Sequence, residues 1–270
     1  MKIIDTHVHF WELSNNINTW VLLADKKLQK NFSPNHLNAD YFVHIEAADS
    51  KVDTLNEINW LDENFSDKKM QYIANIDYFK SLDAFKNEVD RLKKHPKIKG
   101  FRHILSHHKN ASYSPMDHDN LPNDFEEKLK ILAKNNLIFE CQMYPQQINN
   151  ALEIIINSNV KTVIEHFGLP LCHNETDMIK WQKMINNISQ HENIYLKLSG
   201  FFMLNDNETD CKKALNYIFE KIPASRLCYG SNYPVCNTDH YSYWYELLKD
   251  YAPEEMHDDI FYNTAKKIYF

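Results

Sequence analysis

The sequence predicts a parallel (β/α)8 barrel, the TIM-barrel architecture, and three observations support that prediction. Eight short apolar segments alternate with segments of helical spacing, which is the pattern of repeated strand–helix units. The chain has 270 residues, close to the ~250 that such a barrel needs. Polar side chains gather near the carboxyl ends of the apolar segments, where these barrels carry their sites. We therefore expect one domain over residues 1–270.

The strands are expected at eight apolar segments: residues 2–10, 41–48, 72–76, 98–105, 137–143, 160–167, 194–199 and 227–233. Apolar residues recur every three or four positions between and after them, which indicates helices. These helical segments lie within 52–65, 82–92, 125–132, 148–155, 178–188, 215–218, 244–248 and 253–269. The long connection 11–39 is expected to fold over the end of the first strand. An open doubly wound sheet is the alternative, but no Gly-x-Gly-x-x-Gly turn follows any strand.

Composition narrows the class of partner. The net charge is −7 with both signs interspersed, so no clustered basic surface indicates nucleic acid. No apolar run approaches the ~20 residues that span a bilayer, and the first residues do not resemble a secretory signal. The five cysteines form no Cys-x-x-Cys pair, as expected for reduced thiols in the cytoplasm. We expect a cytoplasmic protein with a small-molecule substrate; a homodimer remains an open alternative.

The first strand carries the most informative polar residues. Asp5, His7 and His9 share one face if the strand is regular, because side chains alternate with period two. Two imidazoles so placed can converge on a metal ion or on a reacting carbonyl. A pair of hydrogen-bonded core histidines is the structural alternative.

Other strands also end in polar residues. They are His44 and Glu46, Arg102 and His103, Glu140 and Gln142, Glu165 and His166, Lys197 and Ser199, and Asn232. Strands buried on both faces should instead read as continuous Val, Ile and Leu, so the set indicates a site. Glu165 is expected to point away from His166 and to orient a neighbour. Arg102 has an alternative role as a core ion-pair partner of Glu140. The loop holding His107, His108 and His118 is interpreted as solvated surface.

Six ordered motifs run through the chain. They are Ile4-Asp-Thr-His-Val-His-Phe-Trp11, Lys99-Gly-Phe-Arg-His103, Glu165-His-Phe-Gly-Leu-Pro170, Leu196-Lys-Leu-Ser-Gly200, Arg226-Leu-Cys-Tyr-Gly-Ser-Asn-Tyr-Pro-Val235 and Asn263-Thr-Ala-Lys-Lys-Ile-Tyr269. In these motifs the sequence resembles the amidohydrolase superfamily, in its amidohydrolase-2, lactonase-like group. That group includes L-rhamnono- and L-fuconolactonases and the 2-pyrone-4,6-dicarboxylate lactonase. The resemblance implies an amidohydrolase-like TIM-barrel domain over 1–270.

The resemblance also implies site residues. The family's His-x-His pair corresponds to His7 and His9, its middle-strand histidine to His166, and its strand-four arginine to Arg102. Its last-strand acid falls on Asn232, and an amide neither takes up a proton near neutrality nor binds Zn well. One divalent ion, Zn or Mn, held by His7, His9 and His166 is one expectation. A metal-free mechanism is the other.

The expected reaction is hydrolysis of a lactone of a small sugar acid or related carboxylate by water attack on the ester carbonyl. His7, His9 and Lys197, or a metal ion, would stabilise the developing oxyanion. His166 is the expected base and Glu140 the second candidate. Asn232 is expected to belong to the same catalytic group. Substrate contacts are expected from Arg102, His103, Glu46 and Trp11. The alternatives are a decarboxylase or hydratase of the same family, and a barrel that binds a sugar acid without turnover because Asn232 replaces the acid.

Overall fold

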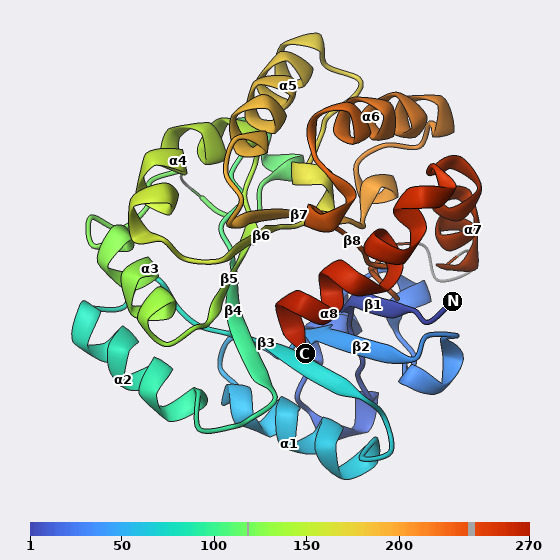
Figure 1. The fold of residues 1–270 in the computed structure, drawn as a ribbon. Helices are drawn as coiled ribbons and strands as arrows, with labels where there is room; N and C mark the ends of the chain where they lie inside the picture. Colours follow the sequence, from blue (N-terminus) through green and yellow to red (C-terminus); the bar gives the residue numbers. More distant parts are fainter. Residues whose placement is uncertain (118, 237–240) are drawn as a thin grey trace.

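The computed structural model describes residues 1–117, 119–236 and 241–270. Eight parallel strands form one sheet in sequence order, with the helices outside it (Figure 1). They are β1 Ile4–Val8, β2 Tyr41–Ile45, β3 Met70–Asn75, β4 Ile98–Ile104, β5 Ile138–Gln142, β6 Thr162–Ile164, β7 Ile194–Leu198 and β8 Leu227–Tyr229. The barrel closes where Val8 bridges Tyr233 in parallel. The predicted (β/α)8 barrel is confirmed.

The helices lie near the predicted segments. They are α1 Thr54–Asn64, α2 Leu82–Leu92, α3 Phe125–Lys134, α4 Pro145–Ser158, α5 Glu175–Ser189, α6 Glu208–Lys221, α7 Tyr241–Tyr251 and α8 Thr264–Tyr269. Several begin at side chains that accept a backbone N–H of the first turn, namely Asp53, Asn174 and Asn207. In α2 the buried residues Phe85, Val89 and Leu92 fall on one face, so this helix packs its apolar side on the sheet.

The amino-terminal end of the barrel is filled and covered. Apolar side chains of seven strands form one cluster inside it: Ile4, Val43, Ile45, Ile73, Ile138, Val163, Tyr195 and Cys228. Ala265, Ile268 and Tyr269 of α8 belong to the same cluster, and α8 crosses this end of the barrel in Figure 1. The cluster leaves the carboxyl ends of the strands as the open end.

Two strands end earlier than predicted. β6 ends at Ile164, because His166 and Phe167 adopt positive φ angles of 54° and 59° that an extended strand does not allow. β8 ends at Tyr229, and Asn232 beyond it has a φ of 56°. Both departures occur at the carboxyl end of the barrel, where they redirect side chains.

The connection from 11 to 39 forms short 3-10 turns, Leu13–Asn15, Thr19–Leu23, Lys26–Leu28 and Pro34–His36. It is fixed to the end of β2, since the Asn18 side-chain amide and the Trp20 indole N–H each donate to the Ala47 carbonyl at 2.7 Å. The backbone N–H of Thr19 donates to Asp49 at 2.9 Å. As expected from the sequence, this segment lies beside the carboxyl end of the barrel.

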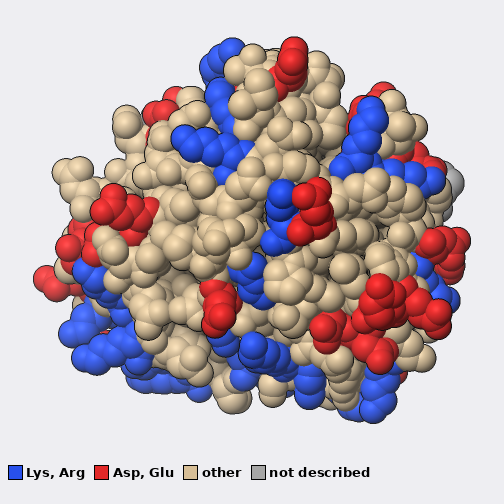
Figure 2. Space-filling model, turned by 45° about the horizontal axis from the view of Figure 1, so that its top comes forward, with Lys and Arg blue, Asp and Glu red and all other residues tan. Residues whose placement is uncertain are grey.

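The surface carries charges of both signs. On the face drawn in Figure 2, neither Lys and Arg nor Asp and Glu cover the whole face, and the two kinds often lie together. Within the described residues, no helix is both long enough and apolar enough to pass through a bilayer.

Candidate active site

Three side chains from β1 and the end of β6 meet inside the carboxyl end of the barrel. The rings of His7 and His166 have centroids 4.5 Å apart. One carboxylate oxygen of Glu165 lies 3.4 Å from His7 Nδ1, and the other lies 3.7 Å from His166 Nε2. One ligand atom from each of the three residues falls within 4.8 Å of the others. We call His7, Glu165 and His166 the central cluster.

The direction of Glu165 differs from the sequence expectation. Val163 belongs to the cluster inside the barrel, so Glu165 two residues later points inward as well. His166 would then face outward, but its positive φ of 54° ends the alternation and returns its ring to the same site. The expectation that Glu165 points away from His166 was therefore wrong. A left-handed residue directly after a strand carried no distinct sequence signal.

Two glycines make room for the histidines. A Cβ added to Gly200 would lie 2.4 Å from His166 Nδ1, and one added to Gly230 would lie 2.8 Å from the Cβ of His7. Real Cβ contacts do not come so close. Gly200 also has a φ of 63°, which favours glycine. The neighbouring Ser199 hydroxyl lies 2.9 Å from His166 Nδ1 and fixes the ring.

The first strand reaches the site through an irregularity. Ile4 belongs to the cluster inside the barrel and Val8 to the outer core, so the alternation changes between them. The pairing of β1 with β2 shifts register between Asp5 and Val8, which accounts for the change. His9 lies next to His7 with ring centroids 5.0 Å apart. Its Nδ1 lies 2.9 Å from the Ile45 carbonyl; because a carbonyl only accepts, Nδ1 carries the proton and Nε2 is the acceptor.

Burial sets the charge of these groups. It lowers the pKa of His7 and His9 well below the usual range, and lowers the pKa of His166 to about 4. For Glu165, burial favours the protonated form, but the Arg102 guanidinium and other nearby cations outweigh it and leave the pKa lowered. At neutral pH the central cluster is thus two neutral imidazoles and one carboxylate.

This donor set fits a divalent metal ion. Neutral imidazole nitrogens and carboxylate oxygens are the groups that Zn binds together with thiolates. Both ring nitrogens of His7 and Oε1 of Glu165 are buried and lack a hydrogen-bond partner within the described part of the chain. Buried polar atoms are normally paired, so these atoms are placed as ligands would be. His9 lies beside this group but outside the set of atoms within 4.8 Å.

A cavity of about 360 Å³ opens above His166. Its polar lining residues are His9, Glu46, Arg102, Gln142, His166 and Asn232. Its apolar lining residues are Trp20, Ala47, Ala48, Ile104, Met203 and Val235. The structure therefore brings together five residues expected from sequence: His9, Glu46, Arg102, His166 and Asn232.

Arg102 is enclosed by protein acceptors. Its Nε donates to Glu46 Oε1 at 2.8 Å, and its two terminal nitrogens donate to Glu165, Gln142 and the Glu46 carbonyl at 2.9–3.2 Å. Burial nevertheless raises the pKa of Glu46 to about 7, against the lowering effect of Arg102. The core ion-pair partners of Arg102 are thus Glu46 and Glu165 and not Glu140.

Glu140 and Lys197 lie deeper than the cavity. Both are fully buried and pair at 3.0 Å, and Lys197 also donates to the Thr6 carbonyl at 2.9 Å. The Tyr269 hydroxyl donates to the other oxygen of Glu140. Burial raises the pKa of Glu140 to about 7 despite Lys197. The described cavity lining includes neither residue, so they support the barrel beneath the central cluster.

Trp11 and His103 also lie away from the cavity. Trp11 is buried and donates its indole N–H to the Lys30 carbonyl at 2.9 Å. Its neighbour Trp20, with ring centroids 5.5 Å apart, lines the cavity instead and is 37% exposed. His103 has Nδ1 3.2 Å from the Ile76 carbonyl and faces a separate polar cleft. The sequence analysis expected Trp11 at the substrate, whereas Trp20 lines the cavity. Both tryptophans occur in the same loop, so their positions in the sequence did not distinguish them.

Asn232 occupies the expected position of the last-strand acid. Its backbone N–H donates to the His7 carbonyl at 2.8 Å, and its side-chain amide lies 3.0 Å from the sulfur of Met203. Its φ of 56° is left-handed, a conformation that Asn tolerates better than most residues. The amide therefore faces the cavity without adding charge.

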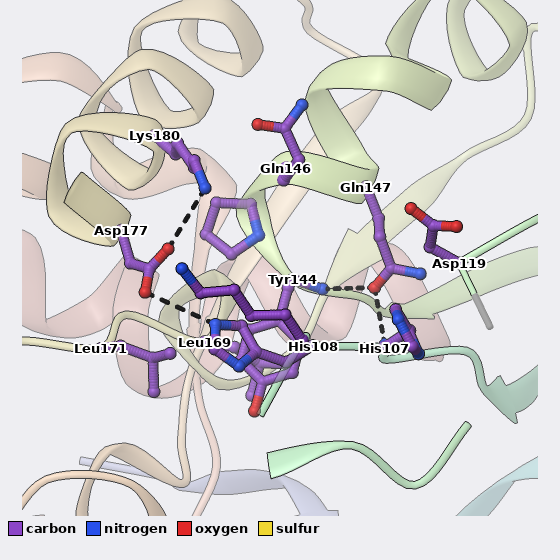
Figure 3. Close-up of a pocket in the computed structure, with 12 residues that line it drawn as sticks. His107, His108, Asp119, Tyr144, Gln146, Gln147, Leu169, Leu171, Asp177 and Lys180 are labelled. Carbon is purple, nitrogen blue, oxygen red and sulfur yellow. Dashed lines mark hydrogen bonds and ion pairs between the residues drawn. The ribbon is translucent and has the colours of Figure 1, made fainter. Parts of the chain in front are cut away.

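A second cavity of about 190 Å³ lies under the loop after β4 (Figure 3). His108 and Lys180 both contact Asp177, at 3.5 and 3.3 Å. Gln147 accepts the backbone N–H groups of His107 and Tyr144. The expectation of a solvated loop was wrong for His107 and His108, which are half-buried against α4 and α5; His118 lies outside the described residues.

The fold thus places a central cluster of two histidines and a carboxylate at the carboxyl end of a (β/α)8 barrel. The amidohydrolase family model matches residues 4–270, so the chain belongs to that family. An uncharacterised protein of Sinorhizobium fredii is 26% identical over 258 residues, covering 87% of this chain and 86% of its own. L-fucono-1,5-lactonase of Burkholderia ambifaria is 22% identical over 245 residues, covering 86% and 80%.

Solved structures show the same fold. An amidohydrolase from Burkholderia multivorans with bound HEPES superposes with a TM-score of 0.77 at 18% identity, over 100% of this chain and 99% of that one. A second crystal form of that protein contains bound zinc and gives a TM-score of 0.76 at 17% identity over the same shares. At this identity the likeness establishes the architecture alone.

Proposed function

We propose that the chain is a hydrolase that opens a lactone of a small sugar acid or related carboxylate by water attack on the ester carbonyl. The observation that carries this proposal is the central cluster at the base of the 360 Å³ cavity. The size lies in the range of small-ligand sites. The similarity to L-fucono-1,5-lactonase supports the same reaction class.

His166 is the candidate general base. It lines the cavity, and its Nδ1 is held by Ser199 at 2.9 Å, which leaves Nε2 to hold a water molecule and accept its proton. The lowered pKa of about 4 keeps the ring in its basic form at neutral pH. Glu165, 3.7 Å from Nε2, would stabilise the imidazolium that forms, since an opposite charge nearby favours the charged state.

The alternative to a free His166 base is a metal centre, in which His7, Glu165 and His166 would hold one Zn or Mn ion with His9 adjacent, and His166 would be a ligand and not the base. Bound there, a divalent ion would supply Lewis-acid polarisation of the ester carbonyl and a more acidic water. The zinc in the related Burkholderia multivorans structure supports this assignment. The ligands would be positioned by residues already described: Ser199 holds His166, and Arg102 holds Glu165.

The upper cavity would hold the sugar ring. Gln142 and Asn232 present amides that both donate and accept, which suits hydroxyl groups. Trp20 offers an aromatic face whose N–H is already bound to the Ala47 carbonyl. An aromatic surface with fixed orientation suits the apolar C–H face of a sugar ring. Together these groups would orient the ester carbonyl toward the central cluster.

A panel of aldonolactones, followed with a pH indicator, tests the proposal. We expect acid release that needs folded protein and falls ~10²–10⁴-fold in His166→Ala, the usual effect of losing a general base. His173→Ala, at an exposed histidine, is the matched control and should keep full activity. The same panel is run after chelation and after adding back Zn or Mn. No ring opening of any lactone, or carbon dioxide release from an aromatic or unsaturated acid, would reject the lactonase assignment.

A further inference from the structure

We infer that the cavity selects an uncharged lactone ring, because Arg102 is committed to protein acceptors and leaves no pair of donors for a substrate carboxylate. The inference rests on the proposed function and names the substrate class of the same site. It also gives Arg102 a different role from the one expected from sequence. Arg102 becomes a positioning residue, and the lactones turned over best carry hydroxyl groups and no acid.

The contacts of Arg102 account for nearly all of its donors. Nε donates to Glu46 Oε1 at 2.8 Å, and one terminal nitrogen donates to both Glu165 and Gln142 at 3.2 Å. The other terminal nitrogen donates to the Glu46 carbonyl at 2.9 Å. A guanidinium has five N–H groups, so one remains. Two-pronged recognition of a carboxylate needs two parallel N–H groups, and the single remaining N–H group cannot form such a pair.

No other lysine or arginine among the described lining residues replaces it. Arg102 is the one Lys or Arg side chain among the described residues that line the cavity. Lys197 is buried beneath the site and held by Glu140 and the Thr6 carbonyl. Glu46, by contrast, lines the cavity and forms an ion pair with Arg102. A carboxylate that entered would meet the Glu46 carboxyl and no free cation, and burying a charge without a partner disfavours binding.

The remaining lining residues suit a neutral, hydroxylated ring. Gln142 and Asn232 are uncharged hydrogen-bonding groups, and Asn232 stands where the family resemblance expected an acid. The opposite side of the cavity is apolar, with Trp20, Met203 and Val235. Small neutral rings with one polar edge and one apolar face match both walls. The two oxygens of a substrate carboxylate would find no matching pair of donors on either wall of the cavity.

The test compares two lactams that resemble the lactone ring and resist hydrolysis: gluconolactam and glucarolactam, which differ in carrying a hydroxymethyl group or a carboxylate. Isothermal titration with the wild-type protein should give affinity ~10-fold or more in favour of gluconolactam, the size expected when a charged group lacks its partner. Glu46→Ala frees Nε of Arg102 for a substrate carboxylate, so the preference should shrink ~10-fold or reverse. Glu46→Gln, which removes charge and keeps an acceptor, should give an intermediate ratio.

His173→Ala is the control, because this exposed histidine lies outside the described cavity lining and should leave the ratio unchanged. Wild-type protein that binds glucarolactam as well as gluconolactam, or that binds neither, contradicts the inference. So does an unchanged ratio in both Glu46 variants. Hydrolysis is measured separately: gluconolactam binding without hydrolysis of any lactone refutes the proposed function alone, and hydrolysis that prefers carboxylated lactones refutes this inference alone.

Discussion

Replacing Gly200 by Ala should disable the site while leaving the barrel folded. The new Cβ would lie 2.4 Å from His166 Nδ1, where ordinary contact begins at 3.4 Å, so the ring must move by about 1 Å. A displacement of ~1 Å at a catalytic group can cost ~10² in rate. The φ of 63° at Gly200 adds a backbone penalty of ~1–2 kcal/mol for a residue with a Cβ.

The matched control is Gly168→Ala. Gly168 has a similar φ of 72°, but its added Cβ would meet the flexible end of Met184 at 2.3 Å and not a ring of the central cluster. Both variants should therefore lose similar stability in urea unfolding, whereas only Gly200→Ala should lose lactone turnover per folded molecule. If the two variants keep equal turnover while Gly200→Ala is folded, the position of His166 does not limit the reaction and the reasoning fails.

Three further predictions follow from single residues. His166→Ala should reduce turnover ~10²–10⁴-fold, whereas Asn232→Ala removes a side-chain contact worth ~0.5–1.5 kcal/mol and should cost roughly tenfold; equal losses in steady-state assays would exclude His166 as the base. Trp20→Ala should raise KM with little change in kcat, and Trp20→Phe should restore most of the affinity; a fall in kcat alone would contradict a stacking role. Burial raises the pKa of Asp5 from 3.8 to about 6, so the folded state disfavours its ionisation and loses up to ~3 kcal/mol as pH rises from about 4 through 6. Asp5→Asn keeps an acceptor for the N–H groups of Ser231 and His7, so its stability relative to wild type should increase between pH 4 and pH 7 in urea titrations; an unchanged difference would contradict the burial of a charged Asp5.

The barrel could be predicted because its signal is repeated. Each strand is a short apolar segment and each helix an amphipathic one, so errors of a few residues at the ends did not alter the architecture. The polar residues at strand ends also predicted which end carries the site. Five of the expected site residues line the cavity for this reason.

The orientation of individual side chains could not be predicted, because it depends on local irregularities of the backbone. The register shift in β1 turns His7 inward, and the left-handed His166 brings its ring beside Glu165. Neither feature has a sequence signal as clear as glycine or proline. Gly200 and Gly230 offered one, since in a chain with four glycines each marks a place where a side chain would collide.

The ion-pair partners of buried residues could not be predicted from the sequence either. Arg102 was expected to face the substrate, but its choice among Glu46, Glu140 and Glu165 depends on which strands are neighbours and on how deep each residue lies. Lys197 lies one layer below the cavity with Glu140, and sequence position alone does not give depth. Trp11 and Trp20 differ in the same way: one is packed under the loop and one reaches the cavity.

Ring opening in water labelled with heavy oxygen tests the central claim most directly. Wild-type protein is incubated with a neutral aldonolactone, and the position of the label in the acid product is read by mass spectrometry at early times, with Glu165→Gln as the background reaction. Attack of water on the ester carbonyl predicts one labelled oxygen, located in the new carboxylate, formed far faster than in the variant. Label in the hydroxyl group, or product formation no faster than in Glu165→Gln, would contradict the account.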